Sequence, residues 1–206
     1  MDKLDYKKDF KELYLPPKKP VIVAVPPIKF IMVAGSGDPN GEEFALRTAA
    51  LYSLSYAVKM SYKGSHVPVG YYDYTVFPLE GVWDLVDKTL PLTDKSNFSY
   101  NLMIRQPEFL TAELFAQFRE ETAKKKPNPY LDSMEFGTIT EGLCCQMLHI
   151  GSYDCEPESF TVMNQYCREH NYRRCSLQHR ELYLSDPRKT ETHKLKTVLR
   201  YQVENA

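Results

Sequence analysis

A carboxylate and a phenol stand two positions apart in the segment that reads Glu-Leu-Tyr-Leu, as Glu181 and Tyr183. In a β-strand, side chains two positions apart point to the same face, so this pair would lie side by side, with Leu182 and Leu184 on the opposite face. A carboxylate beside a phenol can hold a cation, orient a water molecule or act as an acid and a base. The same spacing also fits an exposed sheet face, and spacing alone leaves both interpretations open.

The only tryptophan of the chain, Trp83, ends the segment Phe-Pro-Leu-Glu-Gly-Val-Trp at residues 77–83. A tryptophan most often packs in a core, but its large ring can also line a ligand groove. Both interpretations of Trp83 stay open at this point.

Cysteine and histidine, the residue types that zinc prefers, recur at Cys167, His170, Cys175 and His179. Their spacings do not match a standard zinc finger, and His170 followed by asparagine is more typical of a helix end. The glycines near residue 35 lack the remaining glycines and the lysine of a phosphate-binding loop. We therefore expect neither a metal nor a cofactor.

These residues are set in a chain that alternates short apolar runs with amphipathic segments. Residues 1–28 are charged and then proline-rich, which predicts an N-terminal arm, although residues 21–25 could form an edge strand. The periodicity then predicts strands and helices in turn. Strands are expected at residues 30–34, 71–77, 81–85, 98–104, 143–150, 181–184 and 197–204. Helices are expected after residue 40 with Asn40 or Asp38 as cap, at 111–125 with Thr111 as cap, and at 158–170.

An internal repeat gives the strongest evidence on architecture. A Gly-Ser-x-Asp turn begins at Gly35 and again at Gly151, and at the same offset of 116 positions Glu42 matches Glu158 and Phe44 matches Phe160. In each copy an apolar strand precedes the turn and a helix follows it. The sequence therefore predicts an α+β fold of tandem duplicated β-α-β-β units with pseudo-twofold symmetry. Antiparallel sheets would form a central groove with the helices packed on the outside.

The predicted domain runs from residue 29 to residue 206, after an arm of residues 1–28. Repeat one covers about residues 29–105, a linking helix about 109–126, and repeat two about 133–206. Ligand pockets favour such junctions between repeats, so we expect the binding groove there.

Composition excludes several classes of function. The net charge is −1, so the basic footprint of a nucleic-acid-binding protein is missing. No apolar run approaches the ~20 residues that span a bilayer, and the charged start does not resemble a signal peptide. Five cysteines without framework spacing fit a reducing compartment, so we expect a cytoplasmic location. The 15 tyrosines and 10 phenylalanines supply rings that can grip flat organic ligands.

Four segments resemble the GyrI-like small-molecule-binding superfamily, which also includes effector domains of multidrug-responsive transcription regulators. They are residues 78–83 (PLEGVW), residues 149–154 (HIGSYD), and residues 181–188 (ELYLSDPR) followed by residues 196–200 (KTVLR). The last pair is the most diagnostic, and the resemblance extends over about residues 29–204. It implies the same duplicated fold. No helix-turn-helix segment precedes the domain, so we expect a stand-alone protein rather than a transcription regulator.

The resemblance also implies a ligand and a site. Family members bind bulky, often cationic or planar hydrophobic compounds between the repeats, with a carboxylate that matches Glu181 among aromatic rings. One stand-alone subfamily hydrolyses cyclopropane-bearing DNA-alkylating natural products with the help of an aromatic cage. In such an enzyme Glu181 would orient or deprotonate the attacking water. The predicted ligand-binding residues are Trp83, Tyr183, Tyr100, Tyr201 and Glu80. Asp84 follows Trp83 where relatives often carry a second tryptophan.

Three functions therefore compete. The leading hypothesis is a protein that binds hydrophobic xenobiotics and hydrolyses those with an electrophilic cyclopropane ring. The second is sequestration of the same compounds without turnover. The third is a protein-interaction role, such as inhibition of DNA gyrase, for which an exposed acidic surface would be expected, and no acidic block is present. The oligomeric state is not determined by the sequence.

Overall fold

A computed structural model describes residues 3–64, 67–91 and 94–206, and it divides the chain into two compact units. Unit 1 holds Ile28–Leu79 and Leu85–Ile139, with the short stretch that ends at Asp5. Unit 2 holds Tyr6–Pro27, Glu80–Asp84 and Thr140–Ala206. Each unit combines an antiparallel sheet with helices, so the predicted α+β class is confirmed.

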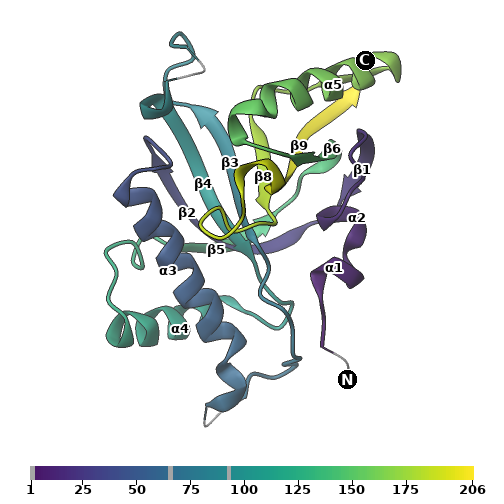
Figure 1. Cartoon of the computed structure of the whole chain (residues 1–206). Coiled ribbons are helices and arrows are strands. Elements are labelled where there is room, and N and C mark those ends of the chain that lie inside the picture. The colour runs from purple at the N-terminus through teal and green to yellow at the C-terminus, as the bar shows by residue number, and fades with distance from the viewer. Residues whose placement is uncertain (1–2, 65–66, 92–93) are drawn as a thin grey trace. The chain divides into compact units, whose positions relative to one another are not determined.

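Unit 1 is built on three antiparallel strands with β2 in the middle, paired to β4 on one side and to β5 on the other. Helix α3 packs against β2 and β4 and also contacts α4 (Figure 1). The elements of the unit are β2 (Ile28–Ser36), α3 (Glu42–Lys59), η1 (Ser61–Lys63), η2 (Lys95–Asn97), β4 (Phe98–Arg105), α4 (Ala112–Lys125) and β5 (Glu135–Ile139).

Unit 2 contains an antiparallel sheet in the order β1-β6-β9-β8-β3, and β7 pairs with the far end of β9. Strand β3 (Leu79–Leu85) contributes its five central residues, 80–84, to this unit. Helix α5 packs against β6 and β7 (Figure 1). The other elements are α1 (Tyr6–Asp9), α2 (Lys11–Tyr14), β1 (Val21–Val25), β6 (Gly142–Ile150), η3 (Tyr153–Cys155), α5 (Glu156–Glu169), β7 (Tyr172–Arg174), β8 (His179–Tyr183), η4 (Thr192–Lys194) and β9 (Lys196–Asn205).

The duplicated plan is confirmed by the order of the elements. The first copy runs β2-α3-β3-β4 and the second runs β6-α5-β8-β9. The short strand ahead of each copy pairs with the first strand of the other copy, since β1 pairs with β6 and β5 pairs with β2. Val21–Val25 is thus the edge strand that the apolar run at residues 21–25 predicted.

Helix ends follow from local chemistry, with one correction. The Thr111 hydroxyl accepts a hydrogen bond from the backbone N–H of Leu114, as predicted for the N-cap of α4. The cap of α3, however, is Gly41 rather than Asn40 or Asp38. The carboxylate of Asp38 instead accepts from the backbone N–H of Asn40, which closes the preceding turn before the helix begins.

One predicted strand is wrong. Residues 71–77 form no strand, and within them only Tyr74 makes an isolated bridge, to Leu4. The rings of Tyr71, Tyr72 and Tyr74 pack on Phe109 with centroid distances of 5.1, 5.5 and 6.2 Å. The aromatic residues that suggested a strand therefore serve ring packing in a loop.

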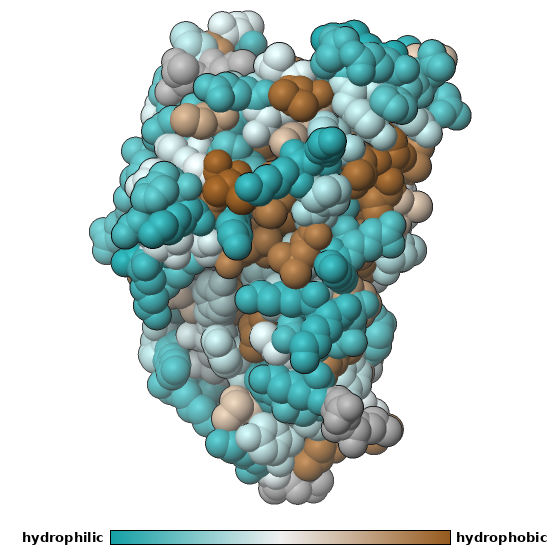
Figure 2. Space-filling model, turned by 45° about the vertical axis from the view of Figure 1, so that its right-hand side comes forward, coloured by the Kyte–Doolittle hydropathy of each residue, from teal (hydrophilic) through white to brown (hydrophobic). Residues whose placement is uncertain are grey.

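Each unit has its own core. In unit 1 the core includes Phe30, Leu51, Leu54, Leu102 and Ile104, which are fully buried. In unit 2 the space under α5 is filled by a cluster of mostly apolar side chains from α5, β6 and β9: Cys145, Met147, Met163, Cys167, Leu199, Tyr201 and Val203. Apolar side chains also reach the surface between polar ones (Figure 2), which is ordinary for a globular protein. Among the described residues, no helix is long and apolar enough to cross a membrane.

Candidate functional site

Two paired strands of unit 2 bring the predicted carboxylate and the tryptophan together. Strand β3 runs antiparallel to β8, with Gly81 opposite Glu181 and Trp83 opposite His179. Residues opposite each other share a face of the sheet, so the indole and the carboxylate lie on the same side. Gly81, which lies opposite Glu181, has no side chain, and the Trp83 indole comes from two residues further along β3.

A chain of hydrogen bonds links the indole to the carboxylate through a phenol. The Trp83 Nε1–H donates to the Tyr183 hydroxyl oxygen over 2.8 Å, and that hydroxyl donates to Glu181 Oε2 over 2.7 Å. Burial, reinforced by the charge of Glu181, raises the pKa of Tyr183 well above its usual value. The phenol therefore keeps its proton and stays a donor. This arrangement supports the interpretation of a polar cluster and not of a solvated sheet face, because Trp83 and Glu181 are 6% and 8% exposed.

The second oxygen of Glu181 is held by a histidine from the same strand. His179 Nε2 lies 3.0 Å from Glu181 Oε1, and the His179 ring meets the edge of the Phe160 ring at a centroid distance of 4.8 Å. Both carboxylate oxygens thus have a fixed partner, which sets the orientation of the group. A carboxylate can accept about four hydrogen bonds, so about two acceptor sites remain for further donors.

A second carboxyl group faces Glu181 from the first residue of α5. Glu156 is 6% exposed, and its Oε1 has no hydrogen-bond partner within the described residues. Burial raises the pKa of Glu156 well above its usual value, and the nearby charge of Glu181 raises it further. The raised pKa favours the protonated form of Glu156, which can donate a hydrogen bond to Glu181.

The repeated Gly-Ser-x-Asp turn of unit 2 presents a further ring to this cluster. Gly151 has a φ of +139°, which side chains rarely tolerate, and the Ser152 hydroxyl accepts from the backbone N–H of Asp154. The ring of Tyr153 then meets the edge of the Tyr183 ring at a centroid distance of 6.0 Å. Burial and the charge of Glu181 raise the pKa of Tyr153 to about 12. The second Gly-Ser-x-Asp turn, at residues 151–154, therefore positions Tyr153 and the start of α5.

Tyr201 lies in the core under α5. Its ring stacks on Phe160 at a centroid distance of 6.3 Å, and its hydroxyl donates to Asn164 Oδ1 over 2.9 Å. The guanidinium of Arg174 covers the ring at 4.4 Å. Tyr201 is 2% exposed and connects to Glu181 through Phe160 and His179.

Tyr100 belongs to unit 1, on β4. Its ring meets the edge of the Phe44 ring at a centroid distance of 5.2 Å and covers Gly35, where a Cβ atom would lie 2.4 Å from Tyr100 Cε2. The glycine of the first repeated turn is thus required by the close approach of this ring. The structure does not bring Tyr100 together with Glu181 in one unit.

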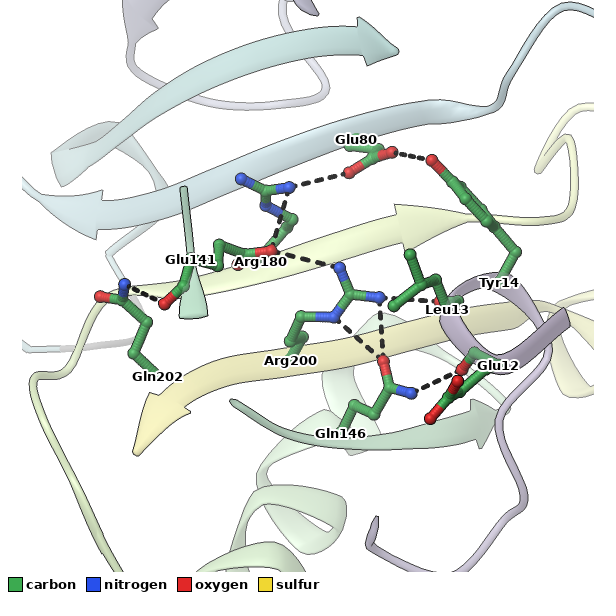
Figure 3. Close-up of polar contacts among 9 residues, drawn as sticks. All are labelled: Glu12, Leu13, Tyr14, Glu80, Glu141, Gln146, Arg180, Arg200 and Gln202. Atoms are coloured by element: carbon green, nitrogen blue, oxygen red, sulfur yellow. Dashed lines mark hydrogen bonds and ion pairs between the residues drawn. The ribbon is translucent and has the colours of Figure 1, made fainter. Parts of the chain in front are cut away.

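Glu80 points to the opposite face of the unit 2 sheet from Glu181. Its carboxylate accepts from the Tyr14 hydroxyl over 3.0 Å and pairs with Arg180 over 3.3 Å (Figure 3). Burial raises the pKa of Glu80, and the charge of Arg180 opposes that rise. Glu80 is therefore part of a buried ion network rather than of the ring cluster around Glu181.

Sequence reasoning missed three members of the cluster: His179, Tyr153 and Glu156. His179 was considered only as a zinc ligand, although its place two residues before Glu181 puts it on the same strand face. Of the other three residues with zinc-binding side chains, Cys167 contacts Tyr201 and His170 contacts the backbone oxygen of Tyr166. Within residues 3–64, 67–91 and 94–206, no group of three or more His, Cys, Asp or Glu residues could hold a metal ion.

The family follows from comparison of the whole chain with known proteins. The model of the GyrI-like small molecule binding domain matches residues 18–203, so the chain belongs to this family. The family assignment confirms the resemblance and shows a domain that binds small molecules. No curated protein matches the chain.

Solved structures with similar chains agree with this assignment. An uncharacterized conserved protein from Listeria innocua is 38% identical, with a TM-score of 0.92 over 98% of this chain and 100% of the other. A hydrolase from the same organism is 36% identical, with a TM-score of 0.90 over 98% and 100% of the two chains. The C-terminal domain of EcmrR shares the fold at 12% identity, with a TM-score of 0.58 over 91% and 98%.

Proposed function

We propose that this protein binds bulky, planar hydrophobic molecules beside Glu181 and hydrolyses those that carry an electrophilic cyclopropane ring. The observation that carries the proposal is the hydrogen-bonded series Trp83–Tyr183–Glu181, in which a largely buried carboxylate is held among aromatic rings. Similarity to a hydrolase from Listeria innocua at 36% identity supports turnover. Family membership supports the small-molecule ligand.

The rings account for binding. Trp83 and Tyr183 belong to the hydrogen-bonded series with Glu181, Tyr153 packs on Tyr183, and Phe160 packs on His179. These four rings would offer apolar faces to a flat ligand. Stacking on such rings contributes to affinity beyond the buried area, and a positive charge on the ligand would add attraction to the rings and to Glu181. Tyr100 and Tyr201 remain predicted ligand-binding residues.

The carboxylate accounts for the reaction. Glu181 would take a proton from a water molecule while the water oxygen forms a bond to a ring CH₂ carbon. The strained C–C bond breaks, and its electron pair moves into a conjugated dienone carbonyl group, which becomes a phenolate and takes up a proton from solvent. Glu181 releases to solvent the proton that it took from the water. The net change is the addition of one water. Placing water and carbon together lowers the barrier by proximity, so little further activation is needed.

The neutral carboxyl of Glu156 has a supporting role in this scheme. By donating to Glu181 it would hold the carboxylate in one orientation while leaving a lone pair for water. His179, whose Nε2 lies 3.0 Å from Glu181 Oε1, would also hold the carboxylate in place. With Glu156 protonated, as its raised pKa favours, the two groups would avoid the repulsion between two buried charges.

Sequestration without turnover is the second candidate. The observation that favours it is that both oxygens of Glu181 already have a partner, Tyr183 over 2.7 Å and His179 over 3.0 Å, so the group is held in place. In that case the ring cluster would hold the ligand and the carboxylate would only balance a positive charge.

Binding can be followed with the only tryptophan of the chain, because Trp83 belongs to the site. Titration with a planar cyclopropane-bearing alkylator is expected to quench Trp83 emission in a saturable way. Trp83→Phe removes this signal, so that variant is tested by calorimetry, where weaker binding is expected. A ligand that binds equally well to Trp83→Phe and to Tyr183→Ala would place its site elsewhere. Saturable binding without a water adduct in the mass spectrum would leave the sequestration function.

A further inference from the structure

A buried ion network covers the face of the unit 2 sheet opposite Glu181 (Figure 3). Arg180 Nη1 lies 3.3 Å from Glu80 Oε2 and 3.2 Å from Glu141 Oε2. The side chains of Arg180, Glu80 and Glu141 are 3%, 1% and 10% exposed. Two carboxylates therefore share one guanidinium in a place that water hardly reaches.

A second arginine extends the network to the next strand. Arg200 Nη1 lies 3.2 Å from Glu141 Oε2, and its Nε donates to Gln146 Oε1 over 3.0 Å. Arg200 Nη2 also donates to the backbone oxygen of Leu13 over 2.7 Å. Strands β6, β8 and β9 are thus joined by side chains as well as by their backbones.

The N-terminal segment at residues 12–14 also contributes hydrogen-bonding groups to the network. The Tyr14 hydroxyl donates to Glu80 Oε1 over 3.0 Å, and Gln146 Nε2 donates to the backbone oxygen of Glu12 over 2.7 Å (Figure 3). Tyr14 is 1% exposed, so this contact is well shielded from solvent. Residues 12–14 therefore supply polar partners that the sheet alone would lack.

The network has a direct geometric consequence for the candidate site. Glu80 and Arg180 immediately precede Gly81 and Glu181, which lie opposite each other across β3 and β8. A slip of β3 by one residue would turn all its side chains over, moving Trp83 away from Tyr183 and Glu80 away from Arg180. An unpaired buried charge is strongly unfavourable, so the ion pair opposes such a slip.

We propose that Glu80 and Arg180 are positioning residues for the site: their ion pair, held by Tyr14, fixes β3 against β8 and so places the Trp83 indole on the Tyr183 hydroxyl. The proposal deepens the proposed function and rests on it for its effect on ligand binding. Its effect on Trp83 itself does not depend on any ligand. A network that only stabilised unit 2 would lower the free energy of unfolding without changing the surroundings of Trp83 in the folded protein.

The test uses Glu80→Gln, which keeps the size of the side chain and a hydrogen-bond acceptor for Tyr14. Trp83 emission of the folded protein, without ligand, is expected to shift to longer wavelength and to become more accessible to acrylamide. Ligand affinity is expected to fall about tenfold, which corresponds to ~1.4 kcal/mol. Tyr14→Phe removes a single oxygen and is expected to shift the emission in the same direction by less, so the test survives if Glu80→Gln fails to fold.

Val203→Ala is the matched control, since Val203 is a buried residue of β9 beyond the part that pairs with β8. It should destabilise unit 2 and leave Trp83 emission unchanged. The proposal would be overturned if Trp83 emission and its quenching by acrylamide were the same in Glu80→Gln and Tyr14→Phe as in the wild type. It would also be overturned if Val203→Ala shifted Trp83 emission as much as Glu80→Gln does. If no ligand is ever found to bind, the proposed function fails, and the emission data still decide whether Glu80 positions Trp83.

Discussion

The Tyr183 hydroxyl is the link whose removal most clearly tests the hydrogen-bonded series. Tyr183→Phe keeps the ring and deletes one oxygen, which accepts from Trp83 Nε1 over 2.8 Å and donates to Glu181 Oε2 over 2.7 Å. The two partners are 6% and 8% exposed, so water replaces the lost hydroxyl poorly. Losing a hydrogen bond to a charged group costs about 1.5–3 kcal/mol and losing a neutral one about 1 kcal/mol. We expect the free energy of unfolding to fall by about 2–3 kcal/mol, because the partners can rearrange in part.

The measurement is urea unfolding followed by circular dichroism, which does not depend on the emission of Trp83. With a slope of about 2 kcal/mol per molar urea, the midpoint should fall by about 1 M. Tyr56→Phe is the control, since Tyr56 is 53% exposed and should leave the midpoint unchanged. A Tyr183→Phe midpoint equal to that of Tyr56→Phe would refute the reasoning, because it would show that neither hydrogen bond contributes to stability.

Three further predictions concern Glu156, Gly35 and Thr111. The raised pKa of Glu156 means that the folded protein binds a proton that the unfolded chain releases above about pH 4.5, so stability falls as pH rises from there to the raised pKa. Glu156→Gln lacks this loss, so its free energy of unfolding relative to that of the wild type should increase as the pH rises above about 4.5; a constant difference would contradict the assignment. Gly35→Ala should destabilise by about 1–3 kcal/mol, since the new Cβ lies 2.4 Å from Tyr100 Cε2, and much less in a Tyr100→Ala background, as a double-mutant cycle would measure. Thr111→Ala should cost about 1 kcal/mol in thermal or urea unfolding through loss of the cap on α4, and Thr111→Ser should restore it.

The duplicated plan could be predicted because it depends on local patterns. The apolar run at residues 143–150, the turn at Gly151 and the helical spacing after it are each short-range signals, and all three are confirmed. The aromatic run at residues 71–77 has the composition of a strand, but it packs against Phe109 far along the chain. Tertiary packing of that kind overrides local propensity and leaves no signal in the sequence.

The candidate site was predictable in part for a similar reason. Strand alternation placed Glu181 with Tyr183, and the structure confirms their contact. Trp83 joins them only through the register of β3 on β8, which no local pattern reveals. The raised pKa of Glu156 depends on burial and on a neighbouring charge, and both arise only when α5 packs on the sheet.

The most direct test of the central claim is hydrolysis in ¹⁸O-labelled water followed by mass spectrometry. The protein is incubated with a planar alkylator that contains a cyclopropane ring conjugated to a carbonyl group. The account predicts a ring-opened product with one ¹⁸O atom, formed rapidly by the wild type and far more slowly by Glu181→Gln. Product formed at the same rate by wild type and Glu181→Gln would contradict the assignment of Glu181 as the base, and unchanged compound in every sample would contradict hydrolysis.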